Sequence, residues 1–171
     1  MDLIKRFNEY FDKIEESLNT PSEITWIDND LVLDGLFKID DIDYKIECKK
    51  QIGNNWSFTF YFLNDSDNWS SEISHKGISS LRVFSTIKEG IIYLYENKKP
   101  DSIIFSAIDD SDTRKRLYTS FCVDFCEKEN LKFLDRGTDK RKLFIIFNDN
   151  LSTERKEDIF SSATKVIEEG K

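Results

Sequence analysis

The sequence predicts an α+β protein with a mixed, mostly antiparallel central sheet and helices on both faces. Two observations support this fold class. Apolar residues alternate with polar ones over much of residues 21–64, which predicts a meander of three or four antiparallel strands. After residue 77, helical spacing of apolar residues alternates with short apolar runs that are typical of buried strands. Strand–helix–strand units beside a meander imply a mixed sheet with helices on both faces.

Residues 1–19 predict an amphipathic N-terminal helix. One helical face carries its apolar residues, Leu3, Ile4, Phe7, Tyr10, Phe11, Ile14 and Leu18. Charged residues occupy the opposite face, which is the pattern of a helix that packs on a domain. The same apolar face could instead be offered to a partner protein or to a second copy of the chain.

Residues 20–151 are expected to form the core of the fold, and the meander comes first. Gly53, Asn54 and Asn55 are turn residues that precede its last strand. Residues 64–80 are polar and rich in turn formers, with Trp69 as an isolated aromatic. We therefore expect a long loop there, and loops of that length in compact domains tend to be mobile or to carry a site.

The second half of the chain alternates helices and strands. Residues 81–97 predict a long helix, because apolar residues recur at three- and four-residue spacing and Pro100 follows. Residues 102–107 predict a buried strand, and residues 109–129 a second amphipathic helix. The remaining predictions are a hairpin over 131–149 with its turn near Arg136 to Asp139, and a C-terminal helix over 152–171 capped by Ser152 or Thr153.

Length and charge narrow the function classes. The 171 residues are enough for one well-buried core, so we expect a single domain over 1–171. A net charge of −8 argues against nucleic acid or an anionic membrane as a partner, and favours a protein partner, a basic one in particular. A homo-oligomer is compatible with the sequence. With no apolar span, no signal-peptide core and three cysteines, a cytoplasmic protein is expected.

The loop before the long helix, Ser74-His75-Lys76-Gly77-Ile78-Ser79, resembles the cofactor loop of the Gcn5-related N-acetyltransferase (GNAT) family. The predicted order of helix, meander, helix, strand, helix, hairpin and helix is also similar to that family. Its loop reads Gln or Arg, two residues, Gly, one residue, then Gly or Ala, and binds the acetyl-CoA pyrophosphate on backbone N–H groups. Here Ser74 and Ser79 replace the outer residues, so the loop is degenerate.

If the chain is an enzyme, the resemblance implies acetyl-CoA as its cofactor. The cofactor-binding residues would then be Gly77, Ile78, Ser79, Ser80 and Arg82. In the family, the Tyr of a Leu-Tyr pair on the next helix often protonates the departing CoA thiolate, and Leu117-Tyr118 is similar. Tyr118 is therefore the candidate catalytic acid, with core packing beside Phe121 and Cys122 as the alternative.

Three segments resemble uncharacterised small proteins encoded by tailed bacteriophages, namely RVFSTI at 82–87, PDSIIFSA at 100–107 and TRKRLY at 113–118. This resemblance implies a phage origin. We expect a protein that acts by protein–protein binding on a GNAT-like scaffold, as an inhibitor of a host factor or of a defence system, or as a virion component. It would then reside in the host cytoplasm or the virion. A bacterial immunity protein would have a similar composition, and the enzymatic alternative is an acetyl-CoA-dependent N-acetyltransferase.

Other catalytic patterns are weak. His75 is the only histidine, which rules out a Ser-His-Asp triad in its usual form and any multi-histidine metal site. Cys122 and Cys126 share the spacing of the apolar helix face, so we expect buried thiols and no metal. Glu47 and Lys49 resemble half of a metal-dependent nuclease motif, but strand alternation also places them on a solvated face.

Overall fold

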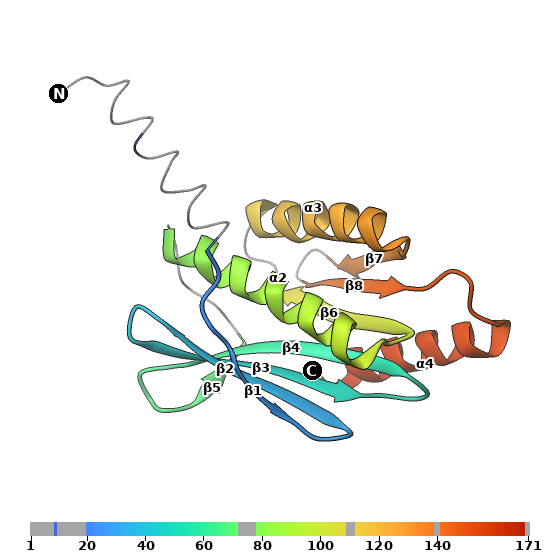
Figure 1. The fold of residues 1–171 in the computed structure, drawn as a ribbon, viewed down its shortest axis with the longest axis horizontal. Coiled ribbons are helices and arrows are strands. Elements are labelled where there is room, and N and C mark those ends of the chain that lie inside the picture. The colour runs from blue at the N-terminus through green and yellow to red at the C-terminus, as the bar shows by residue number, and fades with distance from the viewer. Residues whose placement is uncertain (1–8, 10–19, 72–77, 109–111, 139–140, 170–171) are drawn as a thin grey trace.

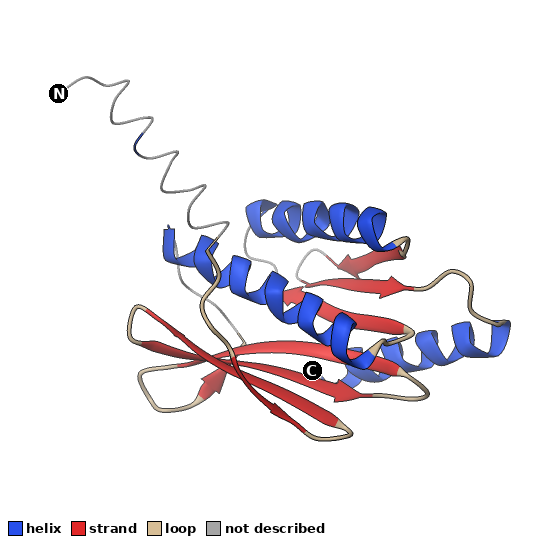
Figure 2. Ribbon diagram, viewed as in Figure 1, coloured by secondary structure: helices blue, strands red, loops and turns tan. Residues whose placement is uncertain are grey.

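The computed structural model describes residues 9, 20–71, 78–108, 112–138 and 141–169. One eight-stranded sheet runs through these residues in the order β1-β2-β3-β4-β6-β8-β7, with β5 paired to β4 (Figure 2). Helices α2 and α3 lie on one face of the sheet and α4 lies on the other (Figure 1). The predicted mixed α+β fold with helices on both faces is confirmed. The predicted N-terminal helix falls outside the described residues apart from Glu9, which is helical.

The predicted meander is present as four antiparallel strands. They are β1 (Thr25–Asp28), β2 (Val32–Ile39), β3 (Ile42–Lys50) and β4 (Asn55–Leu63). Alternate residues of β2 and β3 are buried, for example Leu33 and Phe37 on β2, because one face of these strands faces the core. Asp40 and Asp41 both adopt positive φ in the tight turn from β2 to β3, a conformation that Asp tolerates better than most residues.

The expected long loop over residues 64–80 contains regular structure at both ends. Trp69 and Ser70 form β5, which pairs with Leu63 and Phe62 at the end of β4. Helix α2 (Ile78–Lys98) begins three residues earlier than its apolar spacing indicates. The loop prediction was therefore wrong at these positions, because a two-residue strand is too short for alternation to reveal it. Residues 72–77 lie outside the described part of the chain.

Helices α2 and α3 (Asp112–Glu129) cover the face of the sheet that holds the main core. Between them in sequence, β6 (Ser102–Ile108) turns Ile103 and Phe105 toward this core and Ile104 toward α4. Because β6 is buried on both faces, its residues form a nearly continuous apolar run in the sequence. Within the described residues, no helix is long and apolar enough to cross a membrane.

The predicted hairpin is formed by β7 (Lys132–Thr138) and β8 (Arg141–Phe147). Residues 136–138, predicted near the turn, are paired in β7 with residues 143–141 of β8, and Asp139 lies outside the described residues. Glycine and threonine favour turns, but here the ladder to β8 outweighs that preference. Helix α4 (Thr153–Glu169) follows, and its cap is Ser152, whose hydroxyl accepts the Arg155 N–H at 3.4 Å.

Candidate functional site

The candidate site begins where the parallel strands β4 and β6 part. Their register runs from Asn55 beside Ser102 to Phe58 beside Phe105 and goes no further. At the end of β4, Phe62 and Leu63 pair with β5 on the edge that faces β6. Residues 59–61 of β4 therefore have no strand partner on this edge within the described part of the chain. Residues 106–108 of β6 pair with β8 on one edge only.

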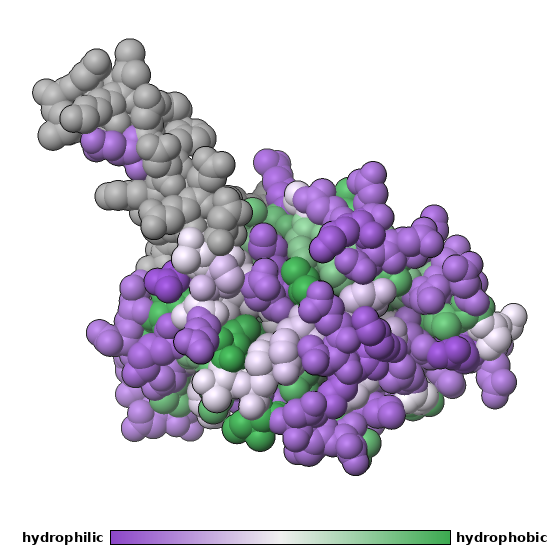
Figure 3. Space-filling view, in the orientation of Figure 1, coloured by the Kyte–Doolittle hydropathy of each residue, from purple (hydrophilic) through white to green (hydrophobic). Residues whose placement is uncertain are grey.

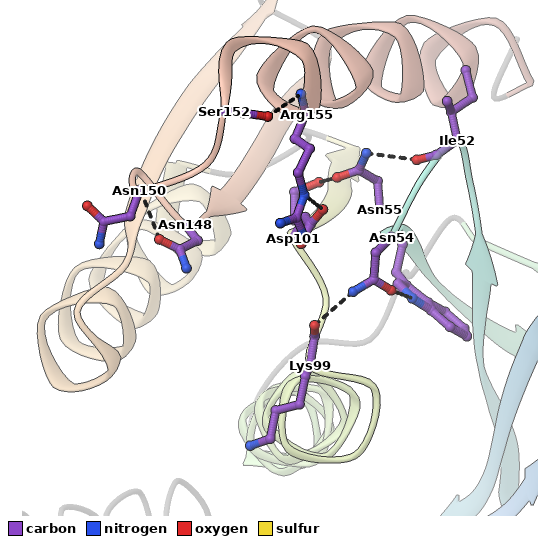
Figure 4. Close-up of polar contacts among 11 residues, drawn as sticks. Ile52, Asn54, Asn55, Lys99, Asp101, Asn148, Asn150, Ser152 and Arg155 are labelled. Atoms are coloured by element: carbon purple, nitrogen blue, oxygen red, sulfur yellow. Dashed lines mark hydrogen bonds and ion pairs between the residues drawn. The ribbon is translucent and has the colours of Figure 1, made fainter.

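Polar side chains hold the two strands together at the opposite end, where the pairing starts (Figure 4). The side-chain amide of Asn54 donates to the Lys99 backbone carbonyl at 2.9 Å, and the Asn54 backbone carbonyl accepts the Asp101 N–H at 2.9 Å. Asn55, which is 1% exposed, accepts the Ser102 hydroxyl at 2.7 Å. Buried polar groups with satisfied hydrogen bonds fix a single geometry. The strands are therefore clamped at one end and separate at the other.

An ion pair ties α4 to this clamp. The Arg155 guanidinium donates to both carboxylate oxygens of Asp101, with Nε to Oδ2 at 2.8 Å (Figure 4). The Asp101 side chain is 10% exposed, whereas Arg155 is half exposed. The Asp101 carbonyl also accepts the Asn148 N–H at 3.1 Å. Bidentate pairing of this kind adds directional specificity to the charge attraction.

Aromatic rings fill the core beside the last paired residues. Phe58 and Phe105 meet edge-on with centroids 6.4 Å apart. Tyr118, the predicted catalytic residue, packs on Phe105 at 5.7 Å, on Phe84 of α2 at 5.2 Å and on Phe144 of β8 at 5.9 Å. Tyr118 is 8% exposed and belongs to the same core cluster as Phe121 and Cys122, so its position agrees with the packing alternative. It also lies next to the point where β4 and β6 part.

The predicted cofactor-binding residues lie at the start of α2, and only some are described. Gly77 lies outside the described residues, and for Ile78 and Ser79 only the helical backbone is described. Ser80 is partly buried and Arg82 is exposed. The first turn of α2 has no acidic residue, which keeps this end of the helix compatible with an anion.

The Glu47 pattern forms an ion-pair network on the outer face of β2 and β3. Lys45 contacts Glu47 at 3.1 Å and Asp34 at 3.4 Å, and Lys49 contacts Glu47 at 2.7 Å. Burial acts to raise the pKa of Glu47, but hydrogen bonds and charge from Lys49 and Lys45 outweigh it and lower the pKa. Among the described residues, no group of histidine, cysteine and acidic side chains could hold a metal ion. The solvated ion-pair interpretation agrees with this geometry.

All three cysteines are buried as free thiols, as the sequence predicted for Cys122 and Cys126. Burial raises the pKa of Cys126 to about 11 and raises the pKa values of Cys48 and Cys122 further. A thiol reacts as its thiolate, so these residues are poor nucleophiles.

Sequence reasoning missed a basic groove between α3 and β8. A hollow of about 580 Å³ is lined by Lys115, Arg116, Thr119, Ser120 and Lys142. The basic residues near the start of α3 are evident in the sequence. No sequence pattern predicts that Lys142, on a strand that follows the helix, lies beside them.

Comparison with known proteins gives structural likeness only. No protein-family model and no curated protein sequence matches the chain. The ribosomal-protein-S5-alanine acetyltransferase of Vibrio fischeri aligns at 11% identity and TM-score 0.41, covering 84% of this chain and 87% of its own. A variant of the spermidine N-acetyltransferase of Vibrio cholerae aligns at 10% identity and TM-score 0.32, covering 84% and 73%. Likenesses this distant assign no role to any residue, and the phage resemblance stays a prediction.

Proposed function

We propose that the chain binds an acyl-CoA where β4 and β6 part and transfers its acyl group to an amine. The observation that carries the proposal is that the parallel pairing of β4 and β6 ends at Phe58 and Phe105. Beyond these residues, the facing backbone edges of the two strands no longer pair with each other. This agrees with the element order that resembles the GNAT family. The sequence favours a protein-binding role, whereas the strand geometry favours the acetyltransferase alternative.

The backbone edges suit an acyl-CoA because its pantetheine arm carries amide groups. Residues 59–61 of β4 present N–H and C=O groups on the edge that β6 has left, and an extended ligand can pair with such an edge. Anionic phosphates would lie toward the start of α2, where the helix dipole is positive and no acidic residue stands in the first turn. Among the residues that the structure describes, Arg82 is the exposed cation closest in sequence to that helix start.

The residues of the chain would contribute positioning and one proton. A CoA thioester supplies an activated acyl group and a thiolate leaving group: the amine nitrogen forms the new C–N bond, the C–S bond breaks, and the amine gives its proton to water. The aromatic packing around Phe105 holds the phenol of Tyr118 beside the parting strands, where it would donate its proton to the departing sulfur. The clamp at Asn55 and Asp101 keeps the strands in the geometry that leaves this end open.

Calorimetric titration of cofactor-free protein with acetyl-CoA and CoA tests the binding step. Micromolar affinity is expected for the wild type, whereas no detectable heat of binding at millimolar ligand would overturn the proposal. Tyr118→Phe tests the chemical step, because it keeps the packing ring and removes the acidic proton. We expect unchanged affinity and a turnover reduced about 100-fold. A variant with full turnover would remove Tyr118 from the mechanism.

A second candidate function is binding of a protein partner, and one surface favours it. Strand β7 is an outer edge of the sheet, and a small apolar hollow of about 50 Å³ lies between it and α4. Leu134 and Phe160 in its lining are 37% and 52% exposed. On the opposite side of the sheet, the face that carries α2 and α3 is mostly hydrophilic, with hydrophobic residues in small separate areas (Figure 3).

Affinity capture with matched variants tests this candidate. Phe160→Ser should abolish capture of a partner that seats in the hollow, because the exposed aromatic is the anchor that such interfaces use. Val123→Ser is the control, since Val123 is similarly exposed on α3 outside the hollow. Equal capture by both variants would exclude this surface.

A further inference from the structure

The basic groove between α3 and β8 brings together side chains that are distant in sequence. Lys115, Arg116, Thr119 and Ser120 come from the first half of α3, and Lys142 comes from β8. The volume of about 580 Å³ falls within the range of small-molecule sites. The Lys142 ammonium lies over the Phe144 ring and pairs with Asp135 of β7, which fixes its position.

The groove and the open backbone edges involve different residues, although Lys142 of the groove pairs in register with Ala107 of β6. Phe125 on α3 packs edge-on against Tyr95 of α2, with centroids 5.4 Å apart, so the side of α3 at Phe125 faces α2. Lys115 and Thr119 are four residues apart and therefore share a side of the helix, and they line the hollow together with Lys142 of β8. The groove thus faces the β8 side and shares no lining residue with residues 59–61 of β4.

We propose that this groove binds a phosphate group, either free or as the phosphomonoester of a small molecule. Arg116 offers a planar fork of N–H donors, the lysines add positive charge, and the Thr119 and Ser120 hydroxyls can donate hydrogen bonds. Phosphate presents several acceptor oxygens to such a set and carries up to two negative charges, whereas a carboxylate presents fewer oxygens and one charge. Among the described residues the lining holds three cations and no acidic side chain, with Asp135 paired to Lys142, in a chain whose net charge is −8.

Titrating the full-length chain with inorganic phosphate, AMP and adenosine tests the proposal, read on the backbone amide NMR signals of Thr119 and Ser120. Phosphate and AMP should shift these signals at millimolar concentration, and adenosine should not. Tighter binding of AMP would identify a phosphomonoester ligand, and equal binding would identify free phosphate. Arg116→Gln and Lys115→Gln should each weaken binding about tenfold, because each removes a charged hydrogen-bond donor.

The matched control is Lys128→Gln, which removes the same charge from the same helix outside the groove. Binding should be unchanged in this variant. The proposal would be overturned if Lys128→Gln weakened phosphate binding as much as the groove variants, or if adenosine shifted the signals as much as AMP. It would also be overturned by tighter binding of a hexaglutamate peptide than of phosphate, or by no shift at millimolar phosphate. Ser120→Ala, a minimal change at an exposed position, keeps the test open if a charge variant fails to fold. Failure of acetyl-CoA to bind would leave this result intact, because the two sites use different residues.

Discussion

Phe58 of β4 and Phe105 of β6 form the last pair in the parallel register of the sheet, and their rings meet edge-on at this point. Before this pair, Asn54, Asn55 and Asp101 fasten the strands by hydrogen bonds. After it, neither strand pairs with the other. The proposed function depends on this geometry, which the packing of α2 and the clamp maintain.

The close approach of α2 to the sheet depends on Gly90. A Cβ atom there would stand 2.5 Å from Ile46 Cδ1 and 3.4 Å from the Phe58 ring. We expect Gly90→Leu to lower the free energy of unfolding by about 2 kcal/mol, since overpacking forces neighbouring side chains to move. Urea unfolding measures the change, with the adjacent exposed position as control in Glu89→Leu. Equal stability of wild type and Gly90→Leu would show that α2 does not pack as described.

The clamp should fail when Arg155 is removed. Arg155→Met leaves the nearly buried Asp101 carboxylate without its counter-charge, so we expect a loss of about 3 kcal/mol in the free energy of unfolding. Adding Asp101→Asn should recover part of that loss, because the uncompensated charge is then gone. Lys156→Met serves as control, because its pair with Asp149 at 3.3 Å is more exposed. If Lys156→Met lowers the free energy of unfolding as much as Arg155→Met does, the bidentate pair has no special role in stability.

The Glu47 network predicts a specific pH dependence. The pKa of Glu47 is lowered in the folded state, so its stabilisation is complete above the unfolded pKa of about 4.3 and is lost as the pH falls through the folded value. Glu47→Gln should therefore cost about 1 kcal/mol near pH 7 and progressively less as the pH falls below the unfolded pKa. Asp43→Asn removes a more exposed partner of Lys38 and should change little at either pH. A Glu47→Gln cost that grows toward acid would contradict the assigned direction.

The buried cysteines predict unreactive thiols. With raised pKa values and no access, Cys48, Cys122 and Cys126 should not react with Ellman's reagent in the native protein. All three should react after unfolding in urea. Rapid reaction of any thiol before unfolding would place that residue at a surface.

Periodicity predicted the long strands and helices because each buries a face that leaves a regular trace in the sequence. Elements of a few residues leave no such trace, which explains why β5 was missed. Residues 136–138 were predicted near a turn because of their residue types, whereas the ladder to β8 extends β7 through them. The site was less predictable for a related reason. The clamp joins Asn55, Asp101 and Arg155, and the basic groove joins Lys115 to Lys142, and such pairings depend on the three-dimensional packing of distant elements.

The most direct test of the acyl-CoA site is hydrogen–deuterium exchange of the full chain with and without acetyl-CoA. Residues 59–61 of β4 and 106–108 of β6 should exchange more slowly with the ligand bound, because the ligand would occupy their open backbone edges. The outer strand β7 should be unaffected. Protection confined to β7, or no protection at millimolar acetyl-CoA, would contradict the proposed function.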